Sequence, residues 1–372
     1  DAAAPSNDQG DTYFDGLGYT IATQDSDPMS KLWYDTKNVD KDGALVTWLS
    51  YSDSAKVKGG YKTVTDINGN GTEAMANILL AQSGTESIVE MALHLMFSSK
   101  TINDYRDAII DATDDLTYVY LVQFVDNPQL AINHVVNNID KYPGATSKID
   151  ARNAQFRVFT DVFMNGYQFT DDTGVLHVLE PITPSKAAKL YKDVCTVSGE
   201  RISYVAASGA MLPIYYGDGS LFSSIAYFGD YVMDGYGAPT HFYTYNAYYG
   251  YATYTDAMYE TLLWKSVIGP SASYYGYTSA YSLLGALALS DGSVKAMPGY
   301  GLEGYEVVTW FVYYNADSNA TTSSDGWTCM KYADAIARQQ ADGGLINYVS
   351  GMTVLKYVGD ANGTELTGTI KD

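Results

Sequence analysis

One stretch, residues 213–281, constrains the fold more than any other part of the chain, because it concentrates aromatic side chains among small ones. It spans under a fifth of the 372 residues but holds about half of the 35 tyrosines, interleaved with Gly, Ala, Ser and Thr. A tyrosine buries a large ring and keeps a polar hydroxyl, which suits broad contact surfaces. Three interpretations follow: core or inter-domain packing, a protein–protein surface, and a platform for sugars.

The densest part of this stretch supplies candidate residues for such a surface. Tyrosine is enriched at the centres of protein–protein interfaces, and its ring can also stack on the face of a sugar. The candidates for an interface or sugar platform are Tyr243, Tyr245, Tyr248, Tyr249, Tyr251 and Tyr254.

The net charge of the chain is -21, from 22 basic and 43 acidic residues. Nucleic acids are bound through basic stripes, and the sequence has none, so we expect no nucleic-acid partner. Anionic membrane surfaces are disfavoured for the same reason. Cations are the natural partners of so acidic a surface.

No apolar run approaches the roughly 20 residues that span a bilayer, so we expect no transmembrane segment. The chain starts at Asp1 with three alanines and no initiator Met, which is typical of a processed mature terminus. Together with the acidity and the Tyr, Thr, Asn and Gly enrichment, this start predicts an extracellular or cell-surface protein. The alternative is an acidic cytosolic protein.

The chain has two cysteines, Cys195 and Cys329, without C-x-x-C spacing. That spacing disfavours a zinc site or a thioredoxin-like motif. In a secreted protein the two form a candidate disulfide, which closes a loop of about 130 residues and stabilises the fold by about 4–5 kcal/mol. The alternative is two separate buried thiols.

The sharpest local motif is D-I-N-G-N-G-T-E at residues 66–73, which matches the first half of an EF-hand calcium loop. Its spacing places three side-chain oxygens on one side. The twelfth position is Asn77 rather than a bidentate Glu, so the alternative is an Asn-Gly turn that precedes a helix. The candidate calcium ligands are Asp66, Asn68, Asn70, Thr72 and Glu73.

Catalytic motifs are absent from the sequence: it has no G-x-S-x-G, no H-E-x-x-H, no Walker A and no Rossmann glycine pattern. Of the four scattered histidines, His241 is the strongest functional candidate because it lies in the Tyr-rich stretch. A glycosidase or lyase that uses a pair of carboxylates is an alternative. The carboxylates among the aromatic residues are Asp218, Asp230, Asp234, Asp256 and Glu260.

Periodicity divides the chain into three parts. Strand-forming runs come first, with Asp42-Gly43 as a hairpin turn, a mainly helical segment covers 73–165, and strands and helices alternate after that. The predicted strands are 17–23, 31–34, 44–51, 60–65, 117–125, 175–179, 201–207, 304–314, 345–358 and 364–370, and the predicted helices are 73–82, 86–97, 102–116, 128–141, 184–194, 255–268, 278–289 and 327–340, while 149–163 suits either.

We therefore expect an α+β fold with N-terminal β-hairpins, a helical middle segment and a Tyr/Gly-rich mixed α/β C-terminal half. Pro181 and Pro184 mark the boundary between two domains. The expected units are a flexible arm at 1–30, an N-terminal α+β domain at 31–180 and a Tyr-rich α+β domain at 181–372.

These features favour a secreted, cell-surface structural protein without catalytic activity. It would self-assemble, as a homo-oligomer or polymer, into an extracellular filament, sheath or surface layer, with calcium as a cofactor. The alternative is a secreted carbohydrate-binding or carbohydrate-active protein that uses the Tyr-rich surface.

Overall fold

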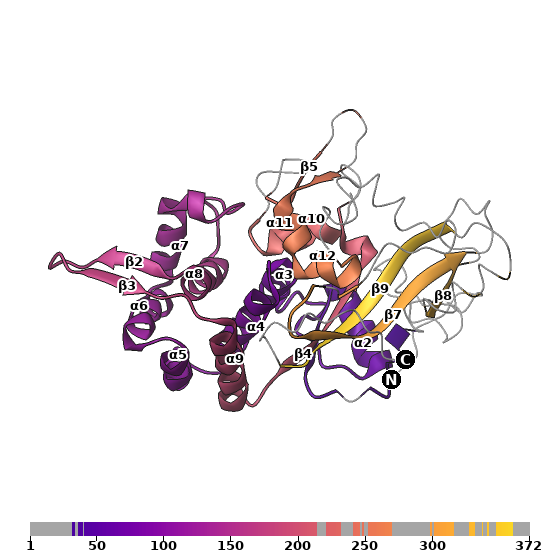
Figure 1. Cartoon of the computed structure of the whole chain (residues 1–372), viewed down its shortest axis with the longest axis horizontal. Coiled ribbons are helices and arrows are strands. Elements are labelled where there is room, and N and C mark those ends of the chain that lie inside the picture. Colours follow the sequence, from indigo (N-terminus) through magenta and orange to yellow (C-terminus); the bar gives the residue numbers. More distant parts are fainter. Residues whose placement is uncertain are drawn as a thin grey trace.

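A computed structural model of the chain describes residues 32–33, 36–39, 41–213, 221–231, 241–245, 248, 252–269, 298–299, 301–315, 327–331, 337, 341 and 347–359. For 245, 311–315, 327–331 and 347–351 it describes the backbone alone. The fold is α+β, as expected from the sequence. A helical lobe and a sheet lie on opposite sides of α3 (Thr72–Leu80), α4 (Gly84–Ser99) and α12 (Leu262–Val267) (Figure 1). The helical lobe comprises the helices between residues 106 and 165 and the hairpin at 167–179.

The main sheet has five strands in the order β1-β4-β9-β7-β8. β1 runs parallel to β4, and the other neighbours are antiparallel. β4 is buried along all of its length, which explains its continuous run of apolar and small residues. The strands are β1 (Ala44–Val46), β4 (Ile202–Ser208), β7 (Tyr305–Asn315), β8 (Trp327–Lys331) and β9 (Asn347–Tyr357).

Helices fill the chain between β1 and β4, and their starts follow local capping rules. Ser83, Asp114, Asp150 and Thr183 each accept a hydrogen bond from a first-turn N–H. The helices before β4 are α2 (Leu49–Gly59), α3 (Thr72–Leu80), α4 (Gly84–Ser99), η2 (Ile102–Tyr105), α5 (Arg106–Ala112), α6 (Asp115–Asp126), α7 (Pro128–Asn137), η3 (Ile139–Lys141), α8 (Ala151–Asn165) and α9 (Pro184–Ser198).

Two small antiparallel pairs stand apart from the main sheet. β2 (Tyr167–Thr170) and β3 (Leu176–Leu179) form a hairpin after α8, and β5 (Tyr243–Tyr245) pairs with β6 (Ala252–Tyr254). The remaining helices are η4 (Gly209–Met211), α10 (Leu221–Phe228), α11 (Asp256–Glu260) and α12 (Leu262–Val267). No helix among the described residues combines the length and the apolarity needed to cross a bilayer.

The strands predicted in the N-terminal part are largely wrong. The predicted strand at 44–51 ends at Val46, because α2 begins at Leu49. The strand predicted at 60–65 is reduced to one isolated bridge between Leu45 and Thr63. Gly43 makes no hairpin turn: a Cβ there would lie 2.4 Å from Ser203 Oγ, so glycine permits β1 to dock beside β4.

Two further predictions are wrong for identifiable reasons. The buried strand predicted at 117–125 is helix α6, whose buried residues Thr117, Tyr120, Leu121 and Phe124 have helical spacing. The helix predicted at 327–340 begins instead with β8, which pairs with β7. The ambiguous segment 149–163 forms helix α8.

The other helices predicted before residue 200 are confirmed within a few residues, as are the strands at 201–207, 304–314 and 345–358. The predicted helix 255–268 is present as α11 and α12. The expected arm at 1–30, the helix at 278–289 and the strand at 364–370 lie outside the described residues.

The sheet is packed on both faces. Alternate side chains of β4 point to opposite sides, so that Val205 and Ala207 join the main core, whereas Tyr204 and Ala206 join a smaller cluster with Trp33. The main core contains side chains from both sides of residue 181, and the division into two domains remains a prediction.

The main core also encloses a carboxyl group between α4 and α8. Glu90 is 3% exposed, and Thr160 Oγ1 donates a hydrogen bond of 2.5 Å to it. Nearby, the Arg157 guanidinium lies 3.9 Å from the ring centre of Tyr231. Burial raises the pKa of Glu90 to about 8, against the opposing effects of Thr160 and Arg157.

This buried carboxyl makes the stability depend on pH. The pKa of Glu90 in the folded protein, about 8, lies above its ordinary 4.5, so between these values the folded state holds a proton that the unfolded chain releases. We expect this group to lower the free energy of unfolding by about 1.4 kcal/mol per pH unit as pH rises through the window. Glu90→Gln should remove this part of the pH dependence and leave the parts due to Glu86 and Asp230, whose pKa values burial also raises. The measurement is urea unfolding at pH 5 to 9.

The matched control is Glu180→Gln, at an exposed carboxylate, which should keep the pH dependence of the unmodified protein. A Glu90→Gln variant with an unchanged pH slope would contradict this explanation.

Candidate functional site

The hairpin β2–β3 projects beyond the helices of the helical lobe (Figure 1). Its inner face is held by an aromatic stack. The ring of Tyr120 on α6 lies 5.1 Å from that of Tyr167 and 4.9 Å from that of Phe169, which in turn stacks on His177 at 5.0 Å. These ring contacts fix an otherwise marginal two-stranded ribbon to the lobe.

The turn of the hairpin is organised by Asp171. Its carboxylate accepts hydrogen bonds from the N–H groups of Thr173 and Val175 and lies 2.8 Å from His177 Nε2. The Thr173 hydroxyl and His177 hold the pKa of Asp171 well below its usual range. These contacts form the turn at residues 171–174 and fix the register of the two strands.

The outer face of the hairpin carries Gln168, Thr170, Leu176 and Val178, none of which is charged. Leu176 is 61% and Val178 is 42% exposed, and Val175 beside them is 52% exposed. Both edges of the ribbon lack a neighbouring strand in the described residues. An exposed apolar face next to open strand edges is a typical docking surface.

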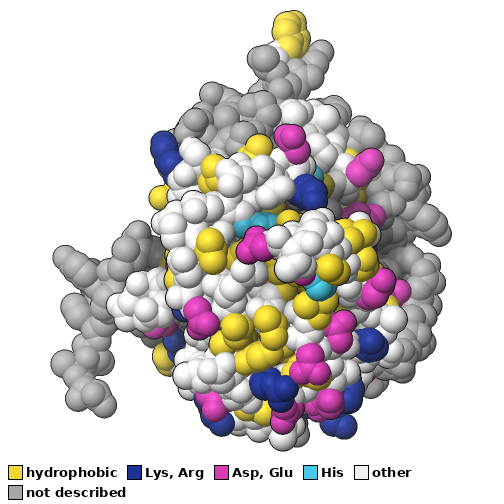
Figure 2. All heavy atoms as spheres, turned by 90° about the vertical axis from the view of Figure 1, so that its left-hand side faces the viewer, with side chains coloured by type: hydrophobic (Ala, Val, Ile, Leu, Met, Phe, Trp, Pro, Cys, Tyr) yellow, Lys and Arg dark blue, Asp and Glu magenta, His cyan; other side chains and the backbone are white. Residues whose placement is uncertain are grey.

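Exposed apolar side chains are concentrated in this lobe. Figure 2 shows this side of the molecule, with hydrophobic side chains spread over it. Of the eleven large apolar residues found exposed in the described part of the chain, six belong to the lobe. These six are Val119, Leu130, Ile139, Val175, Leu176 and Val178.

The predicted calcium loop is a compact turn before α3. The Asp66 carboxylate accepts hydrogen bonds from the N–H groups of Asn68 and Asn70, at 2.8 and 3.1 Å, and from Asn70 Nδ2 at 2.7 Å. Thr72 donates to the carbonyl of Gly69. The helix begins at Thr72 with Glu73 in its first turn, as in the turn-and-helix alternative. Calcium binding remains a prediction.

The structure gathers no group of three or more His, Cys, Asp or Glu side chains suited to a metal ion, within the residues it describes. Asn68 and Asn70 would offer side-chain amide oxygens, and asparagine is not one of these four residue types. The carbonyl and amide ends of Asn70 exchange places by a simple flip. A flipped Asn70 would present its oxygen beside the Asp66 carboxylate.

The Tyr-rich stretch is used partly for packing. Tyr243 and Tyr254 face each other across β5 and β6, and both are buried in the main core. Tyr248, between the two strands, is 86% exposed. Of the other candidates, Tyr245 is described by its backbone alone, and Tyr249 and Tyr251 lie outside the described residues.

The candidate disulfide is described at one end only. Cys195, on α9, forms no disulfide with any side chain that the structure describes. Cys329 lies on β8, where the structure describes the backbone alone, so the pairing remains a prediction.

Among the described residues considered for catalysis, no hydrogen bond or ion pair joins one to another. His241 lies 3.4 Å from Gln82 Nε2, and burial lowers its pKa. Asp230 accepts a hydrogen bond from Asn153, whereas Asp256 and Glu260 are exposed on α11. Asp218 and Asp234 lie outside the described residues.

Comparisons with protein-family models, with curated proteins and with solved structures found no match.

We expect calcium to stabilise the protein through the Asp66 loop. Binding to the folded state alone adds about 2.7 kcal/mol when free calcium is 100 times Kd. Calcium chloride should therefore raise the melting temperature, chelator should reverse the shift, and Asp66→Asn should abolish it in scanning fluorimetry. Asp140→Asn, at an exposed carboxylate outside the loop, serves as the control. Equal melting temperatures with calcium and with chelator would show that the loop is only a turn.

Proposed function

We propose that the protein is a secreted, cell-surface structural protein that self-assembles, as a subunit of an extracellular filament, sheath or surface layer. The observation that carries this proposal is the outer face of hairpin β2–β3, where Leu176 and Val178 are exposed beside open strand edges. The acidity and the Tyr enrichment of the chain support an extracellular location.

A second copy of the chain is the partner that this surface favours. An antiparallel ladder is self-complementary, so the same edge of two copies can pair about a twofold axis, and the second open edge of each ribbon can extend the assembly. The outer face carries no charged residue, although the chain as a whole has a net charge of -21. Contact through this face therefore places no like charges opposite each other at the interface.

Long-range repulsion between two such acidic copies opposes assembly. Salt screens this repulsion, with a Debye length of about 10 Å at 0.1 M. Divalent cations such as calcium neutralise carboxylates more effectively. Assembly should therefore increase with ionic strength and with calcium.

The alternative proposal, a carbohydrate-binding protein, draws support from Tyr248, whose side chain is 86% exposed beside the β5–β6 pair. Binding of a neutral sugar by ring stacking should raise the melting temperature, and Tyr248→Ala should remove the shift. The readout is a thermal-shift screen of sugars, with Tyr227→Ala, at another exposed tyrosine, as the control. An identical response of both variants would speak against a sugar site at Tyr248.

The assembly proposal is tested by placing a charge on the outer face of the hairpin. Val178→Lys should lower the weight-average mass in light scattering and shorten or abolish polymers in negative-stain images, because a buried, unpaired charge at an interface is costly. Val57→Lys makes the same substitution at a 78% exposed valine on α2, away from the hairpin, and should leave assembly unchanged.

Both variants should keep the melting temperature of the unmodified protein. A monomer at all concentrations, with and without calcium, would refute the proposal, as would assembly that Val178→Lys does not weaken.

A further inference from the structure

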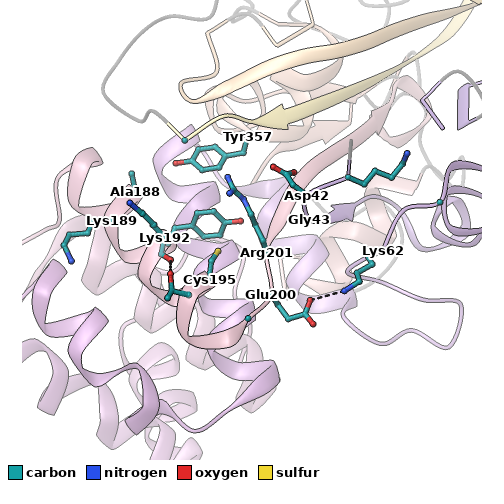
Figure 3. Close-up of a pocket in the computed structure, with 16 residues that line it drawn as sticks. Asp42, Gly43, Lys62, Ala188, Lys189, Lys192, Cys195, Glu200, Arg201 and Tyr357 are labelled. Carbon is teal, nitrogen blue, oxygen red and sulfur yellow. Dashed lines mark hydrogen bonds and ion pairs between the residues drawn. The ribbon is translucent and has the colours of Figure 1, made fainter. Parts of the chain in front are cut away.

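A cleft of about 1070 Å³ opens at the other side of α9 from the lobe (Figure 3). Its walls come from α9, from the first residue before β4, from the end of β9 and from the chain at 41–43 and 60–62. Ligand pockets for organic molecules fall in the range of about 300–1,000 Å³. The cleft is thus large enough for an organic molecule, and far larger than an inorganic ion needs.

The charges in this cleft are the reverse of those in the whole chain. Acidic residues outnumber basic ones 43 to 22 overall, whereas the cleft is lined by five basic residues and two acidic ones. Such a local reversal focuses positive potential in a concave site. The basic residues are Lys41, Lys62, Lys189, Lys192 and Arg201, and the acidic residues are Asp42 and Glu200.

Three of these cations are already engaged. Lys189 pairs with two carboxylates at 3.1 and 2.5 Å, and Lys62 pairs with one at 3.8 Å. The Lys41 ammonium donates to three backbone carbonyls at 2.8 to 3.0 Å. Lys192 and Arg201 form no ion pair in the described part of the chain. Figure 3 shows Arg201 in the middle of the cleft, with Lys189 turned away from it.

The fold holds Lys192 and Arg201 in a fixed relation. Tyr191, next to Lys192, accepts a hydrogen bond of 3.0 Å from the N–H of Ile202, next to Arg201, and donates to the carbonyl of the same residue. The Tyr191 ring also packs edge-on against Tyr357 of β9 at 5.5 Å. The end of α9 is thereby tied to the start of β4, which fixes the backbone positions from which the two cationic side chains extend.

The thiol of Cys195 also lines the cleft. Burial raises its pKa, although Tyr191 and Arg201 oppose this effect. Burial thus disfavours the thiolate, which is the nucleophilic form of cysteine. The cleft consequently suits reversible binding better than covalent chemistry.

We propose that this cleft binds a small organic anion, an acidic or phosphorylated sugar, with its carboxylate or phosphate held between Lys192 and Arg201. A guanidinium matches either group with two parallel hydrogen bonds. The rim supplies acceptors for sugar hydroxyls in Asp42, which also pairs with Lys356 at 3.3 Å, and in Glu200, which also pairs with Lys62 at 3.8 Å. Thr196 adds a hydroxyl to the lining. The site is independent of hairpin β2–β3.

The test is calorimetric titration of the purified chain with four probes: glucuronate, glucose 6-phosphate, glucose and inorganic phosphate. We expect the two anionic sugars to bind more tightly than either glucose or phosphate, with an affinity that falls as sodium chloride is raised. Arg201→Gln and Lys192→Gln should each weaken binding of the anionic sugars at least tenfold. Lys186→Gln, at an exposed lysine of α9 outside the cleft, should not.

The two variants act on different elements, so the test stands if one of them fails to fold. Binding of glucose or phosphate as tight as that of the anionic sugars would overturn the ligand class. Binding of the anionic sugars that neither variant weakens, or none at millimolar concentration, would overturn the site.

Discussion

The structure depends on the burial of β4. Every residue of this strand is buried, so each of its backbone N–H and C=O groups needs a partner within the protein. β9 pairs with residues 204–208 on one side, and β1 pairs with Ile202, Tyr204 and Val205 on the other. These two strands come from segments near opposite ends of the described chain. The same pairing places residues 41–43, the end of α9 and the end of β9 around one cleft.

Local patterns in the sequence predicted the helices well, because capping residues and apolar spacing act within a few residues. Strands were harder to predict. Thr117–Val125 has the composition of a strand, but its apolar residues also have helical spacing, and Asp114 caps the helix. The segment 44–51 contains strand-forming residues, yet its pairing partner lies beyond residue 200, and only three residues are paired.

The candidate functional sites were also only partly predictable from the sequence. The Asp66 motif correctly indicated a turn before a helix, and the tyrosines at 243 and 254 do pack, as one of the interpretations had it. The outer face of hairpin β2–β3 could have been inferred from Leu176 and Val178, which alternate with the inward-facing His177 and Leu179. The cleft could not have been inferred, because segments far apart in the sequence form it.

The parallel pairing of β1 with β4 also has a consequence for the order of folding. Ala44 pairs with Ile202, so this contact closes a loop that contains all the helices from α2 to α9. Contacts so distant in sequence slow folding, because the entropy of loop closure is lost before the contact forms. During synthesis the helical segment can pack on itself early. β1 cannot pair until β4 has been synthesised, and β4 cannot pair with β9 until the C-terminal part has been synthesised. We therefore expect the pairing of β4 with β1 and β9 to form last, and a chain that ends before residue 347 lacks β9 altogether.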